Sequence, residues 1–245
     1  MKKLLSFVAV MALSLGLTTV ISAPAEAKVD WTMKSPFARE IVRPGDVDRD
    51  QYNIEHVYEL QYRLKWVGLL GATPNGVFGP RTERAVKRFQ KRLDVRQTGV
   101  AGHRVWKRLI KRTVRGERAV PKVCKTVGWH TCYDRKRHQV NLYKNGRLLN
   151  SWLVRGGGYD RQTRTGDFRV QWRDIDHTSN AYDDAPMPYS QFFSGGQALH
   201  GSRNMMDPYV GHSHGCVNFW VEDARQLWKL TYDKLLRVHV YGAWD

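Results

Sequence analysis

The spacing of apolar residues changes near residue 121, and this change limits the folds open to the chain. Before that point, apolar residues recur every three or four positions, as they do on the buried face of an α-helix. After it, short runs alternate apolar and polar residues, as they do in half-buried strands. Because the two periods build different cores, we predict two domains, a helical one followed by a mainly-β one. A chain of 245 residues is long enough for both.

The helical period covers residues 51–111 and predicts a compact unit of three helices. In the first helix, Val57 and Leu60 fall on one face, and Gly68 follows where a helix C-terminus is expected. Thr82 is a candidate N-cap for the second helix, because its hydroxyl can accept a backbone N–H. The other predicted core positions are Leu64, Val67, Ala85, Val86, Phe89, Val105, Trp106, Leu109 and Ile110.

The strand period covers residues 122–245 and predicts a β-sandwich-like domain with one or two helices. Asn145-Gly146 stands between two alternating runs and is typical of a β-hairpin turn. Turn signals follow one another too closely for βαβ units. The expected strands are 139–143, 147–154, 167–172 and 236–241, and the expected helix is 220–228. Residues 28–50 predict an extended lead-in, and residues 112–121 predict a linker between the domains.

The first 27 residues have the parts of a secretory signal peptide. Two lysines give a positive start, residues 4–21 are almost all apolar or small, and Ala25 and Ala27 suit a signal peptidase. We therefore expect cleavage after Ala27 and an exported protein, in the periplasm, the cell wall or the extracellular space. The alternative is a membrane anchor, because about eighteen apolar residues nearly span a bilayer.

The chain is strongly basic, with 40 Lys and Arg residues against 23 Asp and Glu, a formal charge of +17. Such a charge holds a protein near polyanions. Outside the cytoplasm these are anionic wall polymers, acidic peptides and lipid head groups, so export argues against nucleic acid as the partner. Residues 81–118 hold fourteen basic and three acidic residues. They form either a solvated helical surface or a patch that rests on an anionic polymer.

His200 and residues 213–218 together hold the groups needed for acyl transfer. Cys216 can act as a nucleophile when a nearby histidine takes its proton, and the histidine can later protonate a leaving amine. Gly215 leaves the backbone beside the sulfur open, so main-chain N–H groups can point at a developing oxyanion. His214 competes with His200 for the role of base, because residues two apart in an extended segment share a face.

The other two cysteines bear on the role of Cys216. Cys124 and Cys132 flank a predicted first strand, and in an oxidising compartment they can form a disulfide. Cys216 is then the odd thiol, for which catalysis is the better explanation. Alternatives stay open: two reduced thiols at the first pair, and a buried structural thiol or a zinc ligand at Cys216. The candidate zinc ligands would be His200, His212, His214 and Cys216, which match no common zinc spacing.

These residues carry a family resemblance. His200-Gly201 followed by Ser213-His214-Gly215-Cys216-Val217-Asn218 resembles the signature of the L,D-transpeptidases, cysteine acyltransferases of bacterial peptidoglycan. The resemblance covers about residues 122–241. Residues 51–111 resemble the three-helix peptidoglycan-binding module. The further matching stretches are 139–154, 163–170 and 187–200 in the second domain, and 76–82, 85–90 and 98–100 in the first.

The resemblance implies roles for individual residues. Cys216 would attack the carbonyl of the third residue of a stem tetrapeptide, and His200 would activate the thiol. The backbone N–H groups of His214, Gly215 and Cys216 would hold the oxyanion, with Ser213 shaping the site. No metal, nucleotide or other cofactor is implied, because a thioester conserves the bond energy. Weaker candidates for the substrate groove are Thr165, Tyr189, Phe193, Gly196 and Asn218.

The sequence departs from the family pattern in places. Asn218 stands where many relatives have Arg, although the Asn form also belongs to the pattern. Arg164 stands where Pro is usual. In the helical module Asn75 replaces a common Asp, and residues 101–104 lack the usual Asp and Thr, which weakens the inference of specific glycan binding.

We therefore expect an exported L,D-transpeptidase that joins the third residues of two stem peptides and releases D-alanine. Its partner would be peptidoglycan, as donor and acceptor, with anionic wall polymers as a second candidate. Two alternatives remain. One is a hydrolase of the L,D-carboxypeptidase type, in which water replaces the acceptor amine. The other is a non-catalytic wall-binding protein in which Cys216 is vestigial.

Overall fold

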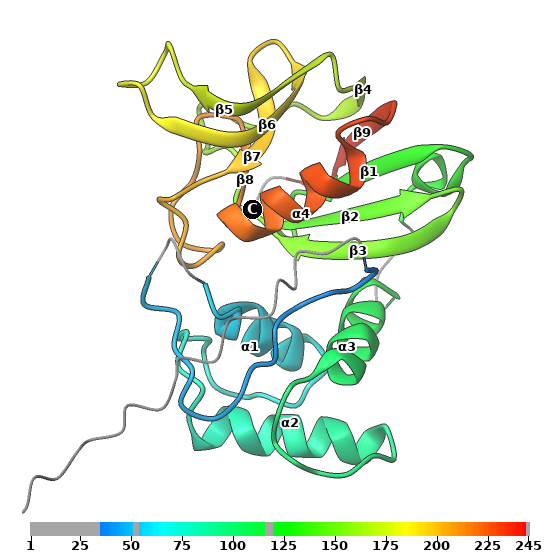
Figure 1. Cartoon of the computed structure of the whole chain (residues 1–245), viewed down its shortest axis with the longest axis vertical. Coiled ribbons are helices and arrows are strands. Elements are labelled where there is room, and N and C mark those ends of the chain that lie inside the picture. Colours follow the sequence, from blue (N-terminus) through cyan, green and yellow to red (C-terminus); the bar gives the residue numbers. More distant parts are fainter. Residues whose placement is uncertain (1–34, 51–53, 116–119, 244–245) are drawn as a thin grey trace, which may run out of the picture.

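The computed structural model describes residues 35–50, 54–115 and 120–243. Within these ranges, three α-helices form an N-terminal unit, and nine strands with one further α-helix form a second unit (Figure 1). The predicted order of a helical domain and a mainly-β domain is confirmed. The predicted signal peptide lies outside the described residues. None of the helices in those ranges combines the length and the apolar character needed to span a bilayer.

The helices of the N-terminal domain are α1 (Val57–Trp66), α2 (Pro80–Arg92) and α3 (His103–Arg115). The positions predicted from the helical period form its core, and only Val67 among them is half-buried. Trp106 is fully buried, and its indole N–H donates to the carbonyl oxygen of Glu40 at 3.0 Å. A buried Trp needs such a partner for its one polar group.

The expected capping role of Thr82 is wrong. The helix α2 already begins at Pro80, with Gly79 in the cap position. Proline suits the first turn of a helix because the N–H that it lacks would have no partner there. The hydroxyl of Thr82 is instead buried and accepts a hydrogen bond from the side-chain amide of Gln61 at 3.0 Å.

The segment before α1 is tied to the core although it contains no helix or named strand. Val42 forms an isolated antiparallel bridge with Ala101, with N–H to O distances of 3.2 and 2.7 Å. Phe37 and Val42 join the apolar core of the helices. In residues 35–50 the missing sequence period therefore goes with irregular structure that packs on the helical core.

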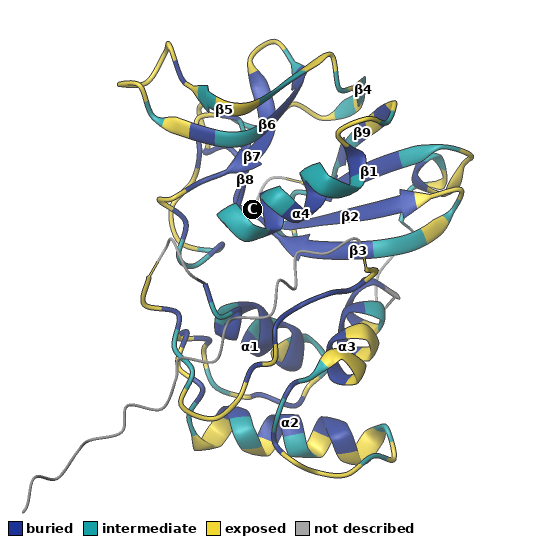
Figure 2. Cartoon of the chain, viewed as in Figure 1, coloured by how far each residue is buried: buried dark blue, intermediate teal, exposed yellow. Residues whose placement is uncertain are grey.

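The second domain contains two β-sheets, with the buried strands facing each other across the core (Figure 2). The five-stranded sheet has the order β3-β2-β1-β9-β4, and the four-stranded sheet has the order β5-β6-β7-β8. Two neighbouring pairs are parallel, β1 with β9 and β7 with β8. The strands are β1 (Trp129–Asp134), β2 (Gln139–Lys144), β3 (Arg147–Leu153), β4 (Gly166–Arg169), β5 (Trp172–Thr178), β6 (Pro186–Ser194), β7 (Gln197–Gly201), β8 (Val217–Phe219) and β9 (Leu236–Tyr241).

Local signals placed three of the described strands, β2, β3 and β9, close to their observed bounds. The β2–β3 hairpin turns at Asn145 and Gly146, both with positive φ (49° and 72°), as the predicted turn requires. The single strand expected over 167–172 is wrong. The strand is interrupted at Val170 and Gln171. The part before them, β4, joins the five-stranded sheet, and the part after them, β5, joins the four-stranded sheet. An alternating pattern gives the face of each residue but not the sheet to which it belongs.

The helix α4 (Val221–Thr231) covers the four-stranded sheet on one face. It starts one residue after the predicted helix and runs three residues beyond it. Ala224 and Leu227 on its inner side pack with Phe193, Leu199 and Val217 in the main core of the domain. This leaves the other face of the four-stranded sheet available for the site.

Buried ion pairs join the two domains. Arg39 and Arg63 both donate to the carboxylate of Glu59 at 2.7 Å, and all three side chains are fully buried. Both guanidinium groups also donate to the carbonyl oxygen of Ser151 on β3, at 2.8 and 2.9 Å. Burial alone would raise the pKa of Glu59, but the two arginines lower it to about 2. The carboxylate therefore stays charged, and the arginines satisfy it.

A second buried cluster lies beside the first. The ring of His56 contacts Glu40 through Nδ1 at 2.5 Å and Asp223 of α4 through Nε2 at 3.2 Å. Burial alone would lower the pKa of His56, yet the two carboxylates raise it well above its ordinary value. A positively charged His56 thus links the helical domain to α4.

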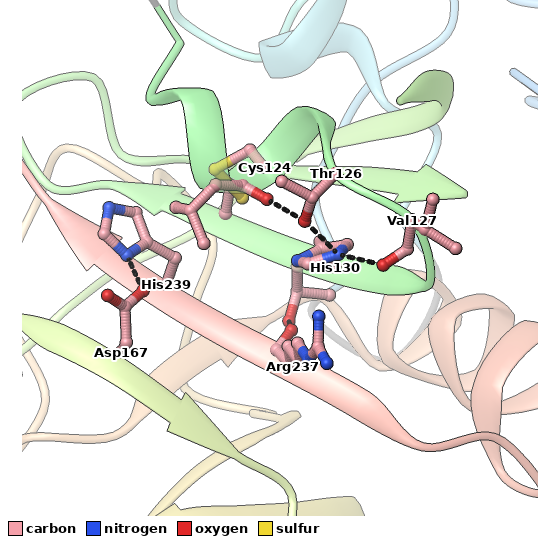
Figure 3. Close-up of a disulfide and its surroundings, with 10 residues drawn as sticks. Cys124, Thr126, Val127, His130, Asp167, Arg237 and His239 are labelled. Atoms are coloured by element: carbon pink, nitrogen blue, oxygen red, sulfur yellow. Dashed lines mark hydrogen bonds and ion pairs between the residues drawn. A yellow bond between two sulfur atoms is a disulfide. The ribbon is translucent and has the colours of Figure 1, made fainter. Parts of the chain in front are cut away.

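A disulfide closes the start of the β domain. Cys124, in the short 3-10 helix η1 (Lys122–Lys125), is bonded to Cys132 on β1 with an S–S distance of 2.06 Å (Figure 3). Both residues are fully buried. Cys216 is a free, half-buried thiol.

Candidate functional site

The predicted nucleophile and base lie on neighbouring parallel strands. The pairing of β7 with β8 sets Leu199 opposite Val217 and His200 opposite Asn218. Cys216 directly precedes β8, and its thiol lies against β7, where the backbone N–H of Ala198 donates to it; His200 is two residues further along that strand. Neighbouring strands are about 4.8 Å apart, which is within reach of two side chains. His200 and Cys216 are sixteen residues apart in the sequence, but the pairing of β7 with β8 brings their segments side by side.

The thiol of Cys216 sits against an apolar wall. Its side chain packs against Met187, Phe192 and Ala198, on the face of the sheet opposite α4. The backbone N–H of Ala198 donates to the sulfur at 3.4 Å. Burial raises the pKa of the thiol, and this N–H only partly offsets the effect. The resting group is therefore a neutral thiol, which needs a base before it can attack.

The environment of His200 favours the neutral form of its ring. Its Nδ1 lies 2.7 Å from the carbonyl oxygen of Gly201, and a carbonyl can only accept, so Nδ1 carries the proton. The lone pair is then on Nε2. Burial lowers the pKa of His200 to about 4. Both residues lie in the described part of the chain, and there the hydrogen bonds of His200 and Cys216 go to backbone groups rather than to each other.

The turn before the nucleophile is fixed by Ser213. Its hydroxyl donates to the carbonyl oxygen of Cys216 at 2.6 Å and accepts from the N–H of Gly215 at 3.1 Å. Gly215 has φ of 116°, and a Cβ there would lie 2.5 Å from the side-chain nitrogen of Gln197. Only glycine fits this position. Ser213 and Gly215 thus shape the loop that aims the backbone of Cys216.

Three consecutive glycines, residues 156–158, pack against this loop at Ser213. The sequence had suggested no role for them in the site. Gly157 forms a parallel bridge with Ser213, and Gly156 and Gly158 exchange backbone hydrogen bonds with the same residue at 2.8 and 3.1 Å. A Cβ on Gly158 would lie 2.5 Å from the ring of His212. The run of glycines was the available signal, because close backbone approach is one of the uses of glycine.

Arg155 is a second residue that the sequence reasoning missed. Its backbone exchanges two hydrogen bonds with Asn218, at 2.9 and 2.8 Å. Its guanidinium donates to the carbonyl oxygens of Asn204 and Val210, at 3.0 and 3.1 Å. Arg155 therefore connects β8 to the loop between His200 and the nucleophile. Nothing in the sequence around it marks this role.

The ring of His214 makes a contact that does not favour its use as the base. Its ring stacks on Tyr182, with centroids 4.2 Å apart and planes 9° from parallel. Arg161 lies over the other ring of this pair, Tyr182, at 5.8 Å. The hairpin tip between β5 and β6 thus reaches the catalytic loop through Tyr182, a contact between distant segments that no local pattern predicts.

The expected groove residues divide into two groups. The carbonyl of Gly196 lies 3.8 Å from the thiol, and Asn218 is paired with His200. Phe193 and Tyr189 are not brought to the thiol. Phe193 is buried in the main core, and Tyr189 packs toward Trp228 of α4. They belong to a different buried cluster from Phe192, which is part of the cluster against which Cys216 packs.

The candidate zinc ligands around Cys216 do not converge. Within the described ranges, the grouping of three metal-ligand atoms is His56, Glu59 and Asp223 at the domain interface. There the carboxylate of Glu59 is already paired with Arg39, so the cluster is an ion-pair network.

Comparison with known proteins places these features in a family. Residues 129–240 match the L,D-transpeptidase catalytic domain, and residues 53–109 match a putative peptidoglycan binding domain. An L,D-transpeptidase structure from Stackebrandtia nassauensis is 22% identical, with a TM-score of 0.50 over 86% of this chain and 98% of that chain. One from Xylanimonas cellulosilytica is 24% identical, with a TM-score of 0.47 over 83% and 98%. No curated protein matches the sequence.

Proposed function

This chain belongs to the L,D-transpeptidase family, with a peptidoglycan-binding domain ahead of its catalytic domain, and we propose that it cross-links peptidoglycan stems through a thioester on Cys216. The observation that supports the proposal is the β7–β8 pairing, which brings the strand of His200 alongside the segment that carries the free thiol, together with the Nδ1 contact that leaves Nε2 of His200 as the proton acceptor.

The first half-reaction uses the groups described above. The sulfur of Cys216 attacks the carbonyl carbon of the third stem residue, while Nε2 of His200 accepts the thiol proton. The C–N bond to the terminal D-alanine then breaks, and His200 returns the proton to the departing amine. The carbonyl ends as a thioester, and both catalytic groups are neutral again.

The oxyanion of this step needs N–H donors. The N–H of Gly215 already donates to the hydroxyl of Ser213. We therefore assign the oxyanion to the N–H groups of His214 and Cys216, with Ser213 and Gly215 holding their direction.

In the second half-reaction, a side-chain amine on a neighbouring stem attacks the thioester carbonyl. The S–C bond breaks and an amide forms between two third residues, with His200 transferring a proton from the amine to the sulfur. This is a 3–3 cross-link. The proposed setting is the cell wall after export, and the proposed partners are peptidoglycan and anionic wall polymers. The chemistry of the steps calls for no cofactor.

The experiment is intact-mass and product analysis of residues 28–245 with a stem tetrapeptide. The expected result is a joined product that has lost D-alanine, with a transient acyl adduct on the protein. The Cys216→Ala variant is the control and should give neither. A shortened tripeptide with no joined product would indicate the hydrolase instead. Binding to wall sacculi without any turnover would favour the non-catalytic alternative.

A further inference from the structure

A groove at the junction of the two domains holds basic side chains that the acyl transfer does not use. Its main cavity, of about 730 Å³, lies between α3 and the β2–β3 hairpin. Of the described residues that line it, Lys107, Lys111, Lys125 and Arg147 carry permanent positive charges, His103 is a fifth basic group, and none is acidic. The apolar part of the lining is Pro36, Phe37, Val114, Val120 and Leu148.

The charges come from both domains and form a row. His103, Lys107 and Lys111 are four residues apart on α3, so they lie on one face at intervals of about 6 Å along the helix axis. Lys125 at the end of η1 and Arg147 at the start of β3 line the same cavity from the catalytic domain. The groove therefore exists only when the two domains are joined.

A second cavity, of about 670 Å³, continues the groove along the catalytic domain. It shares Pro36 and Arg147 with the first. The further basic residues in its lining are Lys144, Lys229 and Lys234. Its one acidic residue among those described, Asp233, is ion-paired with Lys234 at 2.8 Å. The positive excess thus extends through both cavities.

Three basic groups of the first cavity have no carboxylate partner among the described residues. In the described ranges, no carboxylate forms an ion pair with Lys107, Lys125 or Arg147. Like charges held this close repel one another, and a bound anion removes the repulsion. We propose that the junction groove binds an extended phosphodiester polymer, whose successive phosphates meet the successive cations. The proposal rests on the proposed location in the wall but not on the chemistry at Cys216.

The shape and the donors favour this ligand. A groove walled by two domains admits a chain, whereas the flat surface of a membrane cannot enter it. Lysine binds phosphate as a point charge, and the guanidinium of Arg147 can donate two parallel hydrogen bonds to one phosphate. A phosphodiester also keeps one full negative charge per repeat at neutral pH.

The test measures binding of a labelled poly(glycerol phosphate) of defined length to residues 28–245 by fluorescence anisotropy, over a series of salt concentrations. The groove variant is Lys107→Gln, Lys125→Gln and Arg147→Gln together. The matched control is Arg81→Gln, Arg84→Gln and Lys91→Gln on α2, which removes the same charge from exposed positions outside the groove. We expect the groove variant to bind at least roughly tenfold more weakly, with a salt dependence reduced by about three released ions, and the control to lose less than about threefold.

Four outcomes would overturn the proposal: equal losses in the two variants, no binding by the unaltered protein, equal or tighter binding of polyglutamate, or tighter binding of vesicles of phosphatidylglycerol and phosphatidylcholine. The groove variant should turn over a soluble stem tetrapeptide at the unaltered rate. Because the binding measurement can also be made with Cys216→Ala, failure of the groove and failure of the proposed transpeptidation give different results.

Discussion

His200 donates the proton on its Nδ1 to the carbonyl oxygen of Gly201, 2.7 Å away, which leaves Nε2 as the basic nitrogen. Burial lowers the pKa of this ring to about 4, so the base is already neutral well below pH 6.5. We predict that kcat/KM keeps its full value down to about pH 5 and falls only as the pH approaches 4. A pH profile of tetrapeptide turnover tests this. An acid limb near 6.5, the ordinary value for histidine, would contradict it.

Gly157 is predicted to be intolerant of any side chain. A Cβ there would lie 2.0 Å from the carbonyl oxygen of Arg161 and 2.8 Å from the Cα of Gly215, and both are backbone atoms that cannot turn aside. We expect Gly157→Ala to lower kcat at least about a hundredfold, because a displacement of about 1 Å at the catalytic loop has that effect. The control is Gly71→Ala, where a Cβ meets nothing within 4 Å. Equal activity of the two variants would remove Gly157 from the support of the loop.

Arg39 is predicted to be a major contributor to stability. Its removal leaves the buried carboxylate of Glu59 with one fewer cation and takes a donor from the carbonyl of Ser151. We expect Arg39→Met to lower the free energy of unfolding in urea by about 3 kcal/mol, the cost of breaking a buried pair. The control is Lys87→Met, which breaks the partly exposed pair with Glu83 and should cost less than about 1 kcal/mol. Similar losses in both variants would contradict the prediction.

The disulfide is predicted to stabilise the β domain. It closes a loop with a sequence separation of 8 between Cys124 and Cys132. Closing so short a loop contributes about 2–3 kcal/mol in the chain-entropy account. The measurement is the urea midpoint with and without reductant, in a Cys216→Ala background that prevents thiol exchange. A midpoint that does not respond to reductant would show that the bond adds nothing to stability.

The sequence was sufficient where the signal is local. The β2–β3 hairpin follows from Asn145 and Gly146, and the helical core follows from a period of three and four. The candidate pair Cys216 and His200 came from residue types and from the family resemblance, and its catalytic role stays a prediction. Local signals do not show which distant segment a strand or side chain will contact in the folded protein. The break at Val170 and Gln171 depends on which sheet accepts each half, and an alternating run is the same in either case.

The same limit explains the misplaced and missed site residues. Phe192 and Phe193 are equally aromatic neighbours, and only the orientation of β6 decides that Phe192 joins the cluster that packs against Cys216 while Phe193 enters the main core. Arg155 acts on carbonyl groups about fifty residues later in the chain. Its role arises from backbone positions, which leave no mark in the side-chain pattern.

The buried charges that join the domains also set a distance. Arg39, Glu59 and Arg63 satisfy one another and Ser151 in a single arrangement, and sliding the domains would strand a charge away from water. These contacts hold the helical domain against the strand β3 of the domain that carries the thiol. If the first domain binds a wall strand, the distance from that strand to the thiol of Cys216 is set by the fold. We then expect cross-links to form at a constant distance from the place where the protein is bound.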